Sequence, residues 1–476
     1  MTTAADIAAF VADVTYDDLS AAVADATKRR LFDALAVAGV DSDAAAAAAD
    51  VTAAEGGDAC TCWGTGVRAG PAAATLHNAA RVRGSAAADA FLAPDGPSHP
   101  SDAVPAVVAA AEAANADGET LVAALAATYE VHGELAWHAP VREHGWSPAV
   151  HVLVAAAAGA ARARSLDADA TRDAIALAVA NGASFDGNTD EIGADDFAGP
   201  LAARAGVTAA SLAAAGVAGP ADPFVDHPVL ATLLDDAVDA DDSGADADDE
   251  TDDDTGADAE GAACEFGEDT NSIEAHAEEG GFALDPACER VHDAAARRVL
   301  GPFAVQAAVA AAADLGARVA LDPATVERVV VRTFDPLTLP APADDPTPDT
   351  VGVAARSLSY SVAAALVGGP TDLADTLGDE AVRRLAATVA VEEAPGLTAQ
   401  FEAGLLPAVV DVERDDGSVH HAEVGAYPGH PTQPMDWDTL EAKAGRLRDG
   451  DAETLRAACQ RADEAERVAD VLAALD

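Results

Sequence analysis

The chain has 476 residues, of which 83 are acidic and 27 basic, so its formal charge at pH 7 is −56. Its length predicts two or three domains, and an alanine-dominated apolar half with only 4% aromatic residues favours packed helices over a sandwich or a barrel. The charge argues against nucleic-acid and anionic-membrane partners, because both require a basic surface.

The charge also predicts the solvent in which the protein works. Lys28 and Lys443 are the only lysines, and every other basic residue is an arginine. Exposed carboxylates repel one another over about 10 Å at 0.1 M salt but over only about 3 Å at molar salt. The composition therefore predicts a salt-adapted protein more than an acidic regulator. An anionic substrate would have to be held by local arginines.

Cysteine usage and the first residues indicate a reducing, intracellular setting. The five cysteines are an odd number and are dispersed, which is not a disulfide framework. Cys60 and Cys62 are spaced poorly for a metal pair and lack a nearby set of partner ligands, so we expect neither a metal ion nor an iron–sulfur cluster there. Met1–Phe10 lacks a basic region followed by an apolar one, and no apolar stretch is long enough to span a bilayer. We expect a cytoplasmic protein without membrane contact.

Helical periodicity dominates the first half of the chain, and Gly, Pro, Asp and Asn mark its breaks. Two amphipathic helices are expected between Ile7 and Val40. Further helices are expected at Ala72–Arg83, Ala103–Ala116, Glu119–Leu135, Val150–Ala163, Ala168–Ala180 and Gly199–Ala215. We expect residues 1–234 to form the N-terminal part of one all-α domain.

An acidic stretch then interrupts this pattern. Between Asp235 and Glu260, 14 of 26 residues are acidic, and none is aromatic. Such a segment cannot bury enough apolar surface to offset the entropy of ordering it. We expect residues 235–262 to be a disordered insertion or linker.

The second half of the chain mixes helices and strands. Helices are expected at Val299–Leu315 and Ser357–Val367, and strands at Val326–Phe334, Thr388–Val391 and in a hairpin that joins Ala408–Arg414 to Val419–Val424. Two final helices are expected at Asp436–Leu447 and Ala452–Leu475. We expect a mostly α fold, in which residues 263–427 form a smaller α+β lid inserted into the helical domain and residues 428–476 return to that domain.

Several motifs occur in an unusual order. The stretch from Leu76 to Leu135 contains LHNAARVRGSAAADAFLAPDGPSHPSDAVPAVV and ends in ATYEVHGEL; GWSPAVHVLV, AARAGVTAASL, SLSYSVAAALVGG and GHPTQPMDWDTLEAKAGRL follow. In order and spacing these segments resemble the MmgE/PrpD family, which includes 2-methylcitrate dehydratase and cis-aconitate decarboxylase; an iminodisuccinate epimerase shares the fold. The resemblance covers nearly the whole chain except the acidic stretch. It implies a helical domain with an α+β lid, no cofactor, a homodimer and an active site in the cleft between domain and lid.

The resemblance also suggests site residues. His99 falls on the family's catalytic histidine and Asp89 on the aspartate of its acidic loop, and a near-neutral histidine suits proton transfer. The alternatives are a structural hydrogen bond for His99 and a solvated acid for Asp89. Arginine suits bidentate carboxylate binding, so the predicted substrate-binding residues are Arg83, Arg297 and Arg298, together with Tyr360 as a phenolic donor or a packing residue. The alternative for each arginine is an exposed charge that pairs with one of the many acids.

Some family positions are substituted. The family's active-site lysine falls near Asp195, and its central-helix histidine falls on Trp146, with His144 and His151 as imperfect substitutes. Our leading hypothesis is a lyase of the 2-methylcitrate dehydratase type that acts on a small di- or tricarboxylic acid. The alternatives are an isomerase, epimerase or decarboxylase of a related dicarboxylate, or a non-catalytic relative that binds a carboxylate.

Overall fold

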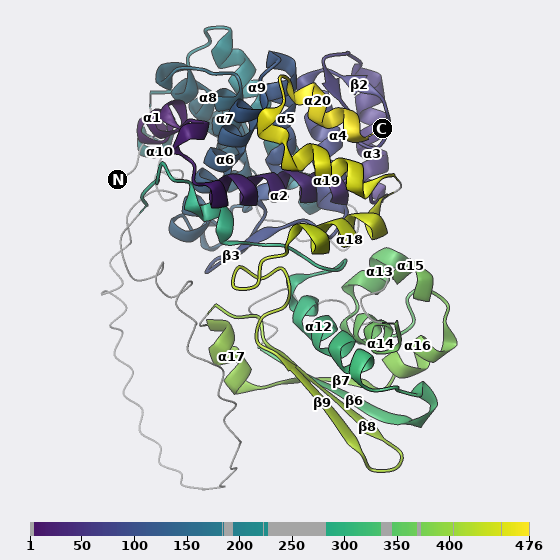
Figure 1. Ribbon diagram of the computed structural model, residues 1–476. Helices are drawn as coiled ribbons and strands as arrows, with labels where there is room; N and C mark the ends of the chain where they lie inside the picture. The colour runs from purple at the N-terminus through teal and green to yellow at the C-terminus, as the bar shows by residue number, and fades with distance from the viewer. Residues whose placement is uncertain are drawn as a thin grey trace, which may run out of the picture.

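The computed structural model describes residues 4–182, 184, 194–221, 223–226, 282–334, 345–368, 373–402, 404–448 and 450–475. A large helical body lies above a smaller body of helices and one sheet (Figure 1). This arrangement confirms the predicted mostly α fold with an α+β lid. The predicted insertion at 235–262 lies outside the described residues.

Alanine-rich helices form the upper body and bury their small side chains against one another. Its helices are α1 (Ala4–Asp13), α2 (Ala21–Val37), α3 (Asp43–Glu55), α4 (Pro71–Gly84), α5 (Val104–Ala114), α6 (Gly118–His138), α7 (Ala149–Ala163), α8 (Ala168–Gly182), α9 (Ala194–Ala214) and α10 (Pro223–Asp226). Ser20, Ser42 and Asp117 cap α2, α3 and α6 by accepting a hydrogen bond from a backbone N–H of the first turn. Small residues let the axes approach closely: a Cβ on Gly159 of α7 would stand 2.0 Å from the Thr128 hydroxyl of α6.

Two small sheets interrupt the helical body and correct the expectation of an all-α unit. The strands β1 (Cys60–Thr61) and β2 (Arg68–Ala69) form a hairpin, and β3 (Ala90–Ala93) lies between β4 (Gly96–Ser98) and β5 (Ala294–Ala295) in an antiparallel sheet. These strands have two to four residues, too few for an alternating pattern to appear in the sequence. Pairing of β3 with β5 joins the chain that enters the lid to the helical body.

The lid is one four-stranded sheet with helices on one face (Figure 1). The sheet order is β7-β6-β8-β9; β6 and β7 are parallel and the other pairs antiparallel. Helices α12 and α14 pack on this sheet and share a hydrophobic core with it. The elements are α12 (Phe303–Arg318), β6 (Val326–Thr333), α13 (Val351–Arg356), α14 (Leu358–Gly368), α15 (Leu373–Thr376), α16 (Glu380–Ala386), β7 (Val389–Glu393), α17 (Pro395–Glu402), β8 (Ala408–Arg414) and β9 (Val419–Val424).

The end of the chain packs on the helical body. Helices α18 (Trp437–Leu447) and α19 (Ala452–Gln460) contact α2 and contribute to the main core. The expected single helix over 452–475 is wrong, because α19 ends at Gln460 and a short α20 (Val468–Leu472) follows. Backbone hydrogen bonds from Gly118 N to Ala465 O and from Val468 N to Ala116 O, 2.9 Å each, hold the intervening segment against the start of α6. Those contacts replace a helical continuation.

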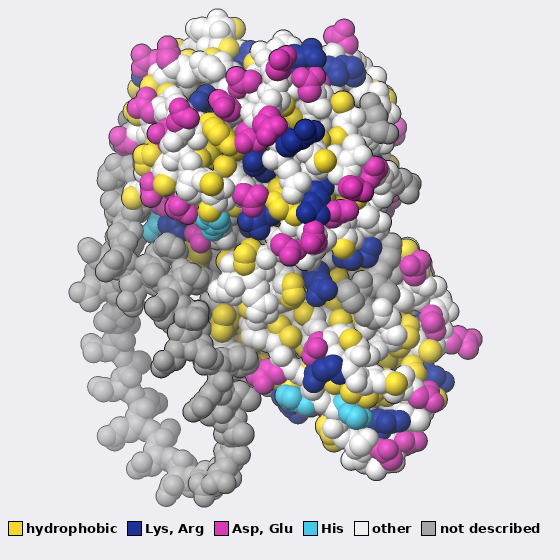
Figure 2. Space-filling view, in the orientation of Figure 1, with side chains coloured by type: hydrophobic (Ala, Val, Ile, Leu, Met, Phe, Trp, Pro, Cys, Tyr) yellow, Lys and Arg dark blue, Asp and Glu magenta, His cyan; other side chains and the backbone are white. Residues whose placement is uncertain are grey.

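Acidic side chains are spread over the visible face of both bodies and do not form a single patch (Figure 2). Arginines and lysines lie among them, and several of these pairs are within ion-pair distance, such as Arg456 with Asp438 and Glu441. No helix in the described part of the chain is long and apolar enough to cross a membrane.

Candidate active site

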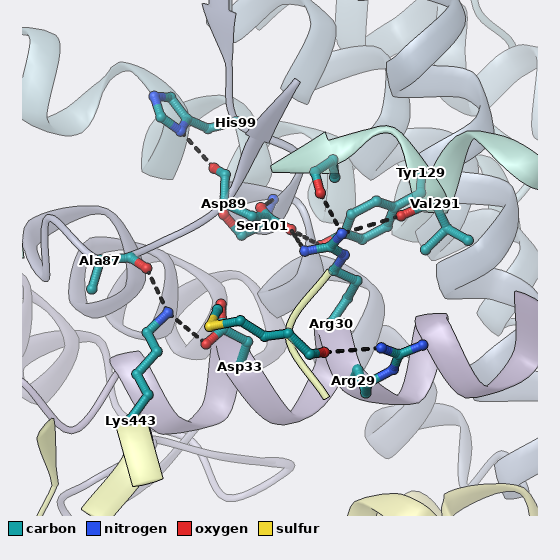
Figure 3. A network of polar contacts seen from close by, with 12 residues as sticks. Arg29, Arg30, Asp33, Ala87, Asp89, His99, Ser101, Tyr129, Val291 and Lys443 are labelled. Atoms are coloured by element: carbon teal, nitrogen blue, oxygen red, sulfur yellow. Dashed lines mark hydrogen bonds and ion pairs between the residues drawn. The ribbon is translucent and has the colours of Figure 1, made fainter. Parts of the chain in front are cut away.

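The predicted site residues gather around the β3–β4 hairpin, where the helical body meets the entrance to the lid. Asp89 directly precedes β3, and His99 directly follows β4 at the start of a 3₁₀ turn over Pro100–Asp102. Pro94 and Asp95 form the turn of the hairpin, and Gly96, the first residue of β4, has a φ of +100° that suits glycine. The nine residues between Asp89 and His99 are thus folded back so that the two lie side by side (Figure 3).

One hydrogen bond fixes the tautomer of His99. Its Nδ1 lies 2.7 Å from the backbone carbonyl oxygen of Asp89 (Figure 3). A carbonyl can only accept, so Nδ1 carries the proton and Nε2 carries the lone pair. Nε2 has no hydrogen-bond partner among the described residues. The ring centroid lies 6.5 Å from that of Phe303 in α12, with the planes 25° apart.

The surroundings keep His99 neutral. Burial lowers the pKa of its imidazole well below the usual 6.5, and the nearby positive charges of Arg83 and Arg297 lower that pKa further. The hydrogen bond to Asp89 opposes these effects only in part. A neutral imidazole with a lone pair on Nε2 is the form that a general base requires.

The Asp89 carboxylate is buried and already engaged. Oδ1 accepts a hydrogen bond from the backbone N–H of Ser101 at 3.1 Å, and Oδ2 accepts one from the hydroxyl of Tyr129 in α6 at 2.8 Å. A guanidinium nitrogen of Arg30 in α2 lies 3.9 Å from Oδ2. Asp89 thus ties α2, α6 and the 3₁₀ turn to the strand that carries it. This geometry favours a positioning role over the predicted share of the acid–base work.

A buried ion pair lies beside this network (Figure 3). Nζ of Lys443 in α18 donates to Oδ1 of Asp33 in α2 at 2.7 Å and to the carbonyl of Ala87 at 2.9 Å. Both side chains are almost completely buried. Burial lowers the pKa of Lys443 and raises that of Asp33, and the attraction between the two charges opposes both shifts. Lys443 therefore holds the turn that precedes Asp89 against two helices.

That turn has an uncommon backbone. Ala86 has a φ of +52°, a left-handed conformation that a residue with a side chain seldom adopts. Its carbonyl accepts a hydrogen bond from Gly301 N at 2.9 Å, at the entrance to the lid. Lys443 holds the next carbonyl, that of Ala87. Contacts from the lid entrance and from α18 therefore stabilise the local strain.

Asp102 is a second buried carboxyl, three residues after His99. Its Oδ2 lies 3.8 Å from a guanidinium nitrogen of Arg83, and its Oδ1 is buried without a hydrogen-bond partner among the described residues. Burial raises the pKa of Asp102 to about 6; the charge of Asp89 adds to the rise, and Arg83 and Arg297 oppose it. Gly199 of α9 has room only for a hydrogen beside this carboxyl, because a Cβ would stand 2.1 Å from Oδ2.

Arg297 has no acidic partner within ion-pair distance among the described residues. Its guanidinium carbon lies 4.4 Å above the centre of the Phe303 ring, and Nε is buried without a hydrogen-bond partner in that same set. Burial lowers the pKa of Arg297 to about 10, and the positive charge of Arg83 adds to that effect. In a chain with three acids for each base, a partly buried guanidinium without an acid is suited to a bound anion.

Comparison with known families identifies the fold. The model of the MmgE/PrpD N-terminal domain matches residues 5–234, and that of the MmgE/PrpD C-terminal domain matches residues 302–468. The chain belongs to the MmgE/PrpD family. A comparison with curated proteins finds no match. The two matches leave out the acidic stretch and the segment that carries β5 and Arg297.

Four of the six predicted site residues come together in the structure: Arg83, Asp89, His99 and Arg297. Arg298 follows Arg297; its backbone N–H donates to Gln306 Oε1 at 3.0 Å, and burial lowers the pKa of its guanidinium. Tyr360 lies elsewhere. It is buried in the lid core, where its hydroxyl donates to the carbonyl of Thr376 at 2.5 Å. That geometry fits the packing alternative for Tyr360 and not the substrate-binding one.

The substitutes for the central histidine of the MmgE/PrpD family do not reach the site as free bases. His151 is buried behind the hairpin: Nε2 donates to Ala139 O at 2.9 Å, so Nδ1 accepts from the Ser98 hydroxyl at 3.0 Å. The same hydroxyl then accepts from Nε2 of His132 at 2.8 Å. This cluster fixes Ser98 and thereby the backbone that carries His99. His144 is exposed, and the side chain of Asp195 lies outside the described residues.

Sequence reasoning missed several residues around the site. Arg30 and Asp33 project from one face of α2, Tyr129 from α6, and Lys443 from the far end of the chain. One signal was available: Lys443 is one of two lysines in an arginine-rich chain, a pattern that suggests a specific need for an ammonium group. Asp102 follows the His-Pro-Ser motif directly. No group of three or more His, Cys, Asp or Glu side chains in the described part of the chain is arranged to hold a metal.

Proposed function

We propose that this protein is a lyase that removes water from a small di- or tricarboxylic acid, as 2-methylcitrate dehydratase does. Membership of a family that includes dehydratases supports this proposal. The observation that carries it is the pairing of a neutral His99, with the Nε2 lone pair open, and Arg297, a partly buried guanidinium without an acidic partner among the described residues.

These two side chains divide the chemistry between them. A carboxylate bound by Arg297 gains acidity at the neighbouring carbon, because the cation stabilises negative charge that develops on the carboxylate. The Nε2 atom of His99 accepts the proton of that carbon, and the resulting imidazolium shares its Nδ1 proton with the Asp89 carbonyl. The electron pair of the C–H bond forms the new double bond as the hydroxyl group on the next carbon leaves.

A second candidate is an epimerase of a related dicarboxylate. Both oxygens of Asp89 hold structural hydrogen bonds, so fewer acids remain to assist the departure of hydroxide. Epimerisation needs proton removal and return but no leaving group. The products distinguish the two candidates, since only dehydration yields an alkene that absorbs in the ultraviolet.

Three further properties are part of the proposal. A net charge of −56 supports a salt-adapted protein, and we propose a cytoplasmic setting and a homodimer. Exposed apolar residues on α9, Leu201 and Leu212 at 53% and 43%, provide a surface that a second copy could cover. Light scattering at molar salt would measure the mass of the particle and thereby distinguish a monomer from a homodimer.

The central test is the substitution His99→Gln, measured in molar KCl with 2-methylcitrate, citrate, cis-aconitate and iminodisuccinate. Gln is polar and similar in size but lacks the basic nitrogen, so kcat should fall by about 10²–10⁴ while the fold is retained. His421→Gln, at a histidine 55% exposed on β9, is the matched control and should keep full activity. Equal turnover by wild type and His99→Gln would contradict the proposal.

A further inference from the structure

A small apolar cluster lies next to His99, and both bodies of the molecule contribute to it. Its buried members are Ala90, Ala295, Phe303, Phe334, Leu406 and Tyr427. Phe303 is the ring that faces both His99 and Arg297. The cluster therefore places Tyr427, in the connection between β9 and α18, beside the candidate active site.

The Tyr427 ring is locked in place. Gly429, with a φ of +123°, packs against it so closely that a Cβ would stand 3.0 Å from Cε2 of the ring and 2.2 Å from the carbonyl of Ala296. The carbonyl of Gly429 in turn accepts a hydrogen bond from Ala296 N at 2.7 Å. Because Arg297 follows Ala296, this contact positions the tyrosine and the arginine together.

The hydroxyl of Tyr427 is a buried donor without a partner among the described residues. Leaving a buried polar group unpaired costs about 1–3 kcal/mol, so such a group calls for an explanation. The other fully buried tyrosines pair their hydroxyls, Tyr129 with Asp89 and Tyr360 with Thr376. Tyr427 thus resembles a donor kept for a ligand.

Three polar atoms near Phe303 therefore have no hydrogen-bond partner among the described residues. Nε2 of His99 is an acceptor, while Nε of Arg297 and the Tyr427 hydroxyl are donors. The charge of Arg297 acts on both His99 and Tyr427, which places the arginine near both groups. A base, a cation and a proton donor are the set that dehydration of a hydroxy acid requires.

We propose that Tyr427 is a catalytic residue that donates its phenolic proton to the departing hydroxyl group of the substrate. This inference rests on the proposed dehydratase function. The C–H proton passes to His99, its electron pair forms the C=C bond, and the C–O bond breaks as the oxygen takes the Tyr427 proton and leaves as water. The imidazolium of His99 then returns a proton to the tyrosinate, and no oxidant or other reactant is consumed.

The electrostatics of Tyr427 fit this role. Burial raises the pKa of its hydroxyl, so the proton stays in place until a strongly basic oxygen forms beside it. The positive charges of Arg297 and Arg30 act in the opposite direction and would stabilise the tyrosinate. An unperturbed phenol has a pKa of about 10 and is a stronger acid than water, so a phenol can protonate a departing hydroxide.

The test compares two substitutions that each remove one hydroxyl, Tyr427→Phe and Tyr360→Phe. In molar KCl, Tyr427→Phe should lower kcat on 2-methylcitrate by about 10² or more and leave the melting temperature unchanged. Tyr360→Phe should show the opposite pattern: full activity, and a melting temperature lower by about 2 °C, because it loses a satisfied hydrogen bond. Affinity for citrate, measured by calorimetry, provides a readout independent of turnover.

Each outcome of this comparison either supports or overturns the role of Tyr427 as a proton donor. If wild type is active and Tyr427→Phe keeps its kcat, the inference is wrong while the dehydratase proposal stands. If Tyr427→Phe loses as much thermal stability as Tyr360→Phe, the hydroxyl has an internal partner and the inference fails whatever the activity. If wild type turns over none of the acids, the dehydratase proposal fails; citrate binding about tenfold weaker in Tyr427→Phe would then support a donor that contacts the ligand, and equal binding would overturn it.

Discussion

At the scale of single residues, the partner of His99 decides its chemistry. A backbone carbonyl orients the imidazole, whereas a carboxylate in that place would raise its pKa. Burial and two nearby arginines lower the pKa instead. The base form should persist well below pH 6.5, so the acid limb of a pH–rate profile should lie below the ordinary histidine range.

A residue-scale prediction concerns Asp102, whose pKa is raised to about 6 from 3.8. The folded protein then holds this proton more tightly than the unfolded chain, so the stabilisation is present below pH 3.8 and is lost as pH rises to about 6. Asp102→Asn mimics the protonated form. Its unfolding free energy should exceed that of wild type by about 3 kcal/mol at pH 7, and the two should converge near pH 4.

The measurement is urea unfolding at constant molar KCl from pH 4 to pH 7.5. Asp314→Asn, at an acid 56% exposed on α12, is the control and should follow the wild-type curve. If the unfolding free energy of Asp102→Asn runs parallel to that of wild type across the whole range, the carboxyl does not titrate in this window, which would contradict the prediction.

At the scale of elements, hydrophobic periodicity predicted the helices and strands that have a long apolar pattern and missed those that lack one. The helices α4 to α9 and the strands β6, β8 and β9 lie close to their expected ranges. Helix α3 was missed because its run of alanines has no apolar face. The contacts of Lys443 could not be predicted either, since they join residues 410 and 356 positions apart, and no local pattern records such pairings. Candidate site residues were found where a motif was local, as at His99, and missed where three elements meet.

The element-scale prediction is that Lys443 pins α18 to α2 and to the turn before Asp89. Lys443→Met leaves Asp33 buried without its partner and should destabilise the fold by about 3–5 kcal/mol. The double substitution Lys443→Met with Asp33→Leu removes both charges and should recover much of that loss. Lys28→Met, which removes a partly exposed pair with Asp463, should cost only about 1 kcal/mol.

Urea unfolding of the three variants at pH 7.5 in molar KCl would measure these differences. Equal losses of unfolding free energy for Lys443→Met and Lys28→Met would show that the buried pair stabilises the fold no more than the partly exposed pair does. The double variant also separates structure from chemistry: a stable fold with kcat reduced about tenfold or more would mean that the Lys443 charge, and not only the packing, supports the site.

At the scale of the whole molecule, the charge and the packing oppose each other. Close-packed alanine helices bury a large core, while a net charge of −56 expands the chain at low ionic strength. The site works against the same field, because Arg297 must hold an anion inside an acidic protein. Salt should therefore affect both folding and substrate binding, and for different reasons.

For folding, the prediction is that thermal stability rises steeply between 0.1 M and about 3 M KCl. The range of repulsion between exposed carboxylates falls from about 10 Å to less than about 3 Å over that interval, so the penalty for compactness shrinks. Circular dichroism at 222 nm during heating would measure the melting temperature at each salt concentration. Salts also strengthen apolar burial, so the control is acid: at 0.1 M KCl, lowering the pH from 7.5 to 5 begins to neutralise the carboxylates and should restore part of the stability without added salt. Stability that responds to KCl but not to acid would assign the effect to apolar burial, and stability indifferent to both would contradict the salt-adapted interpretation.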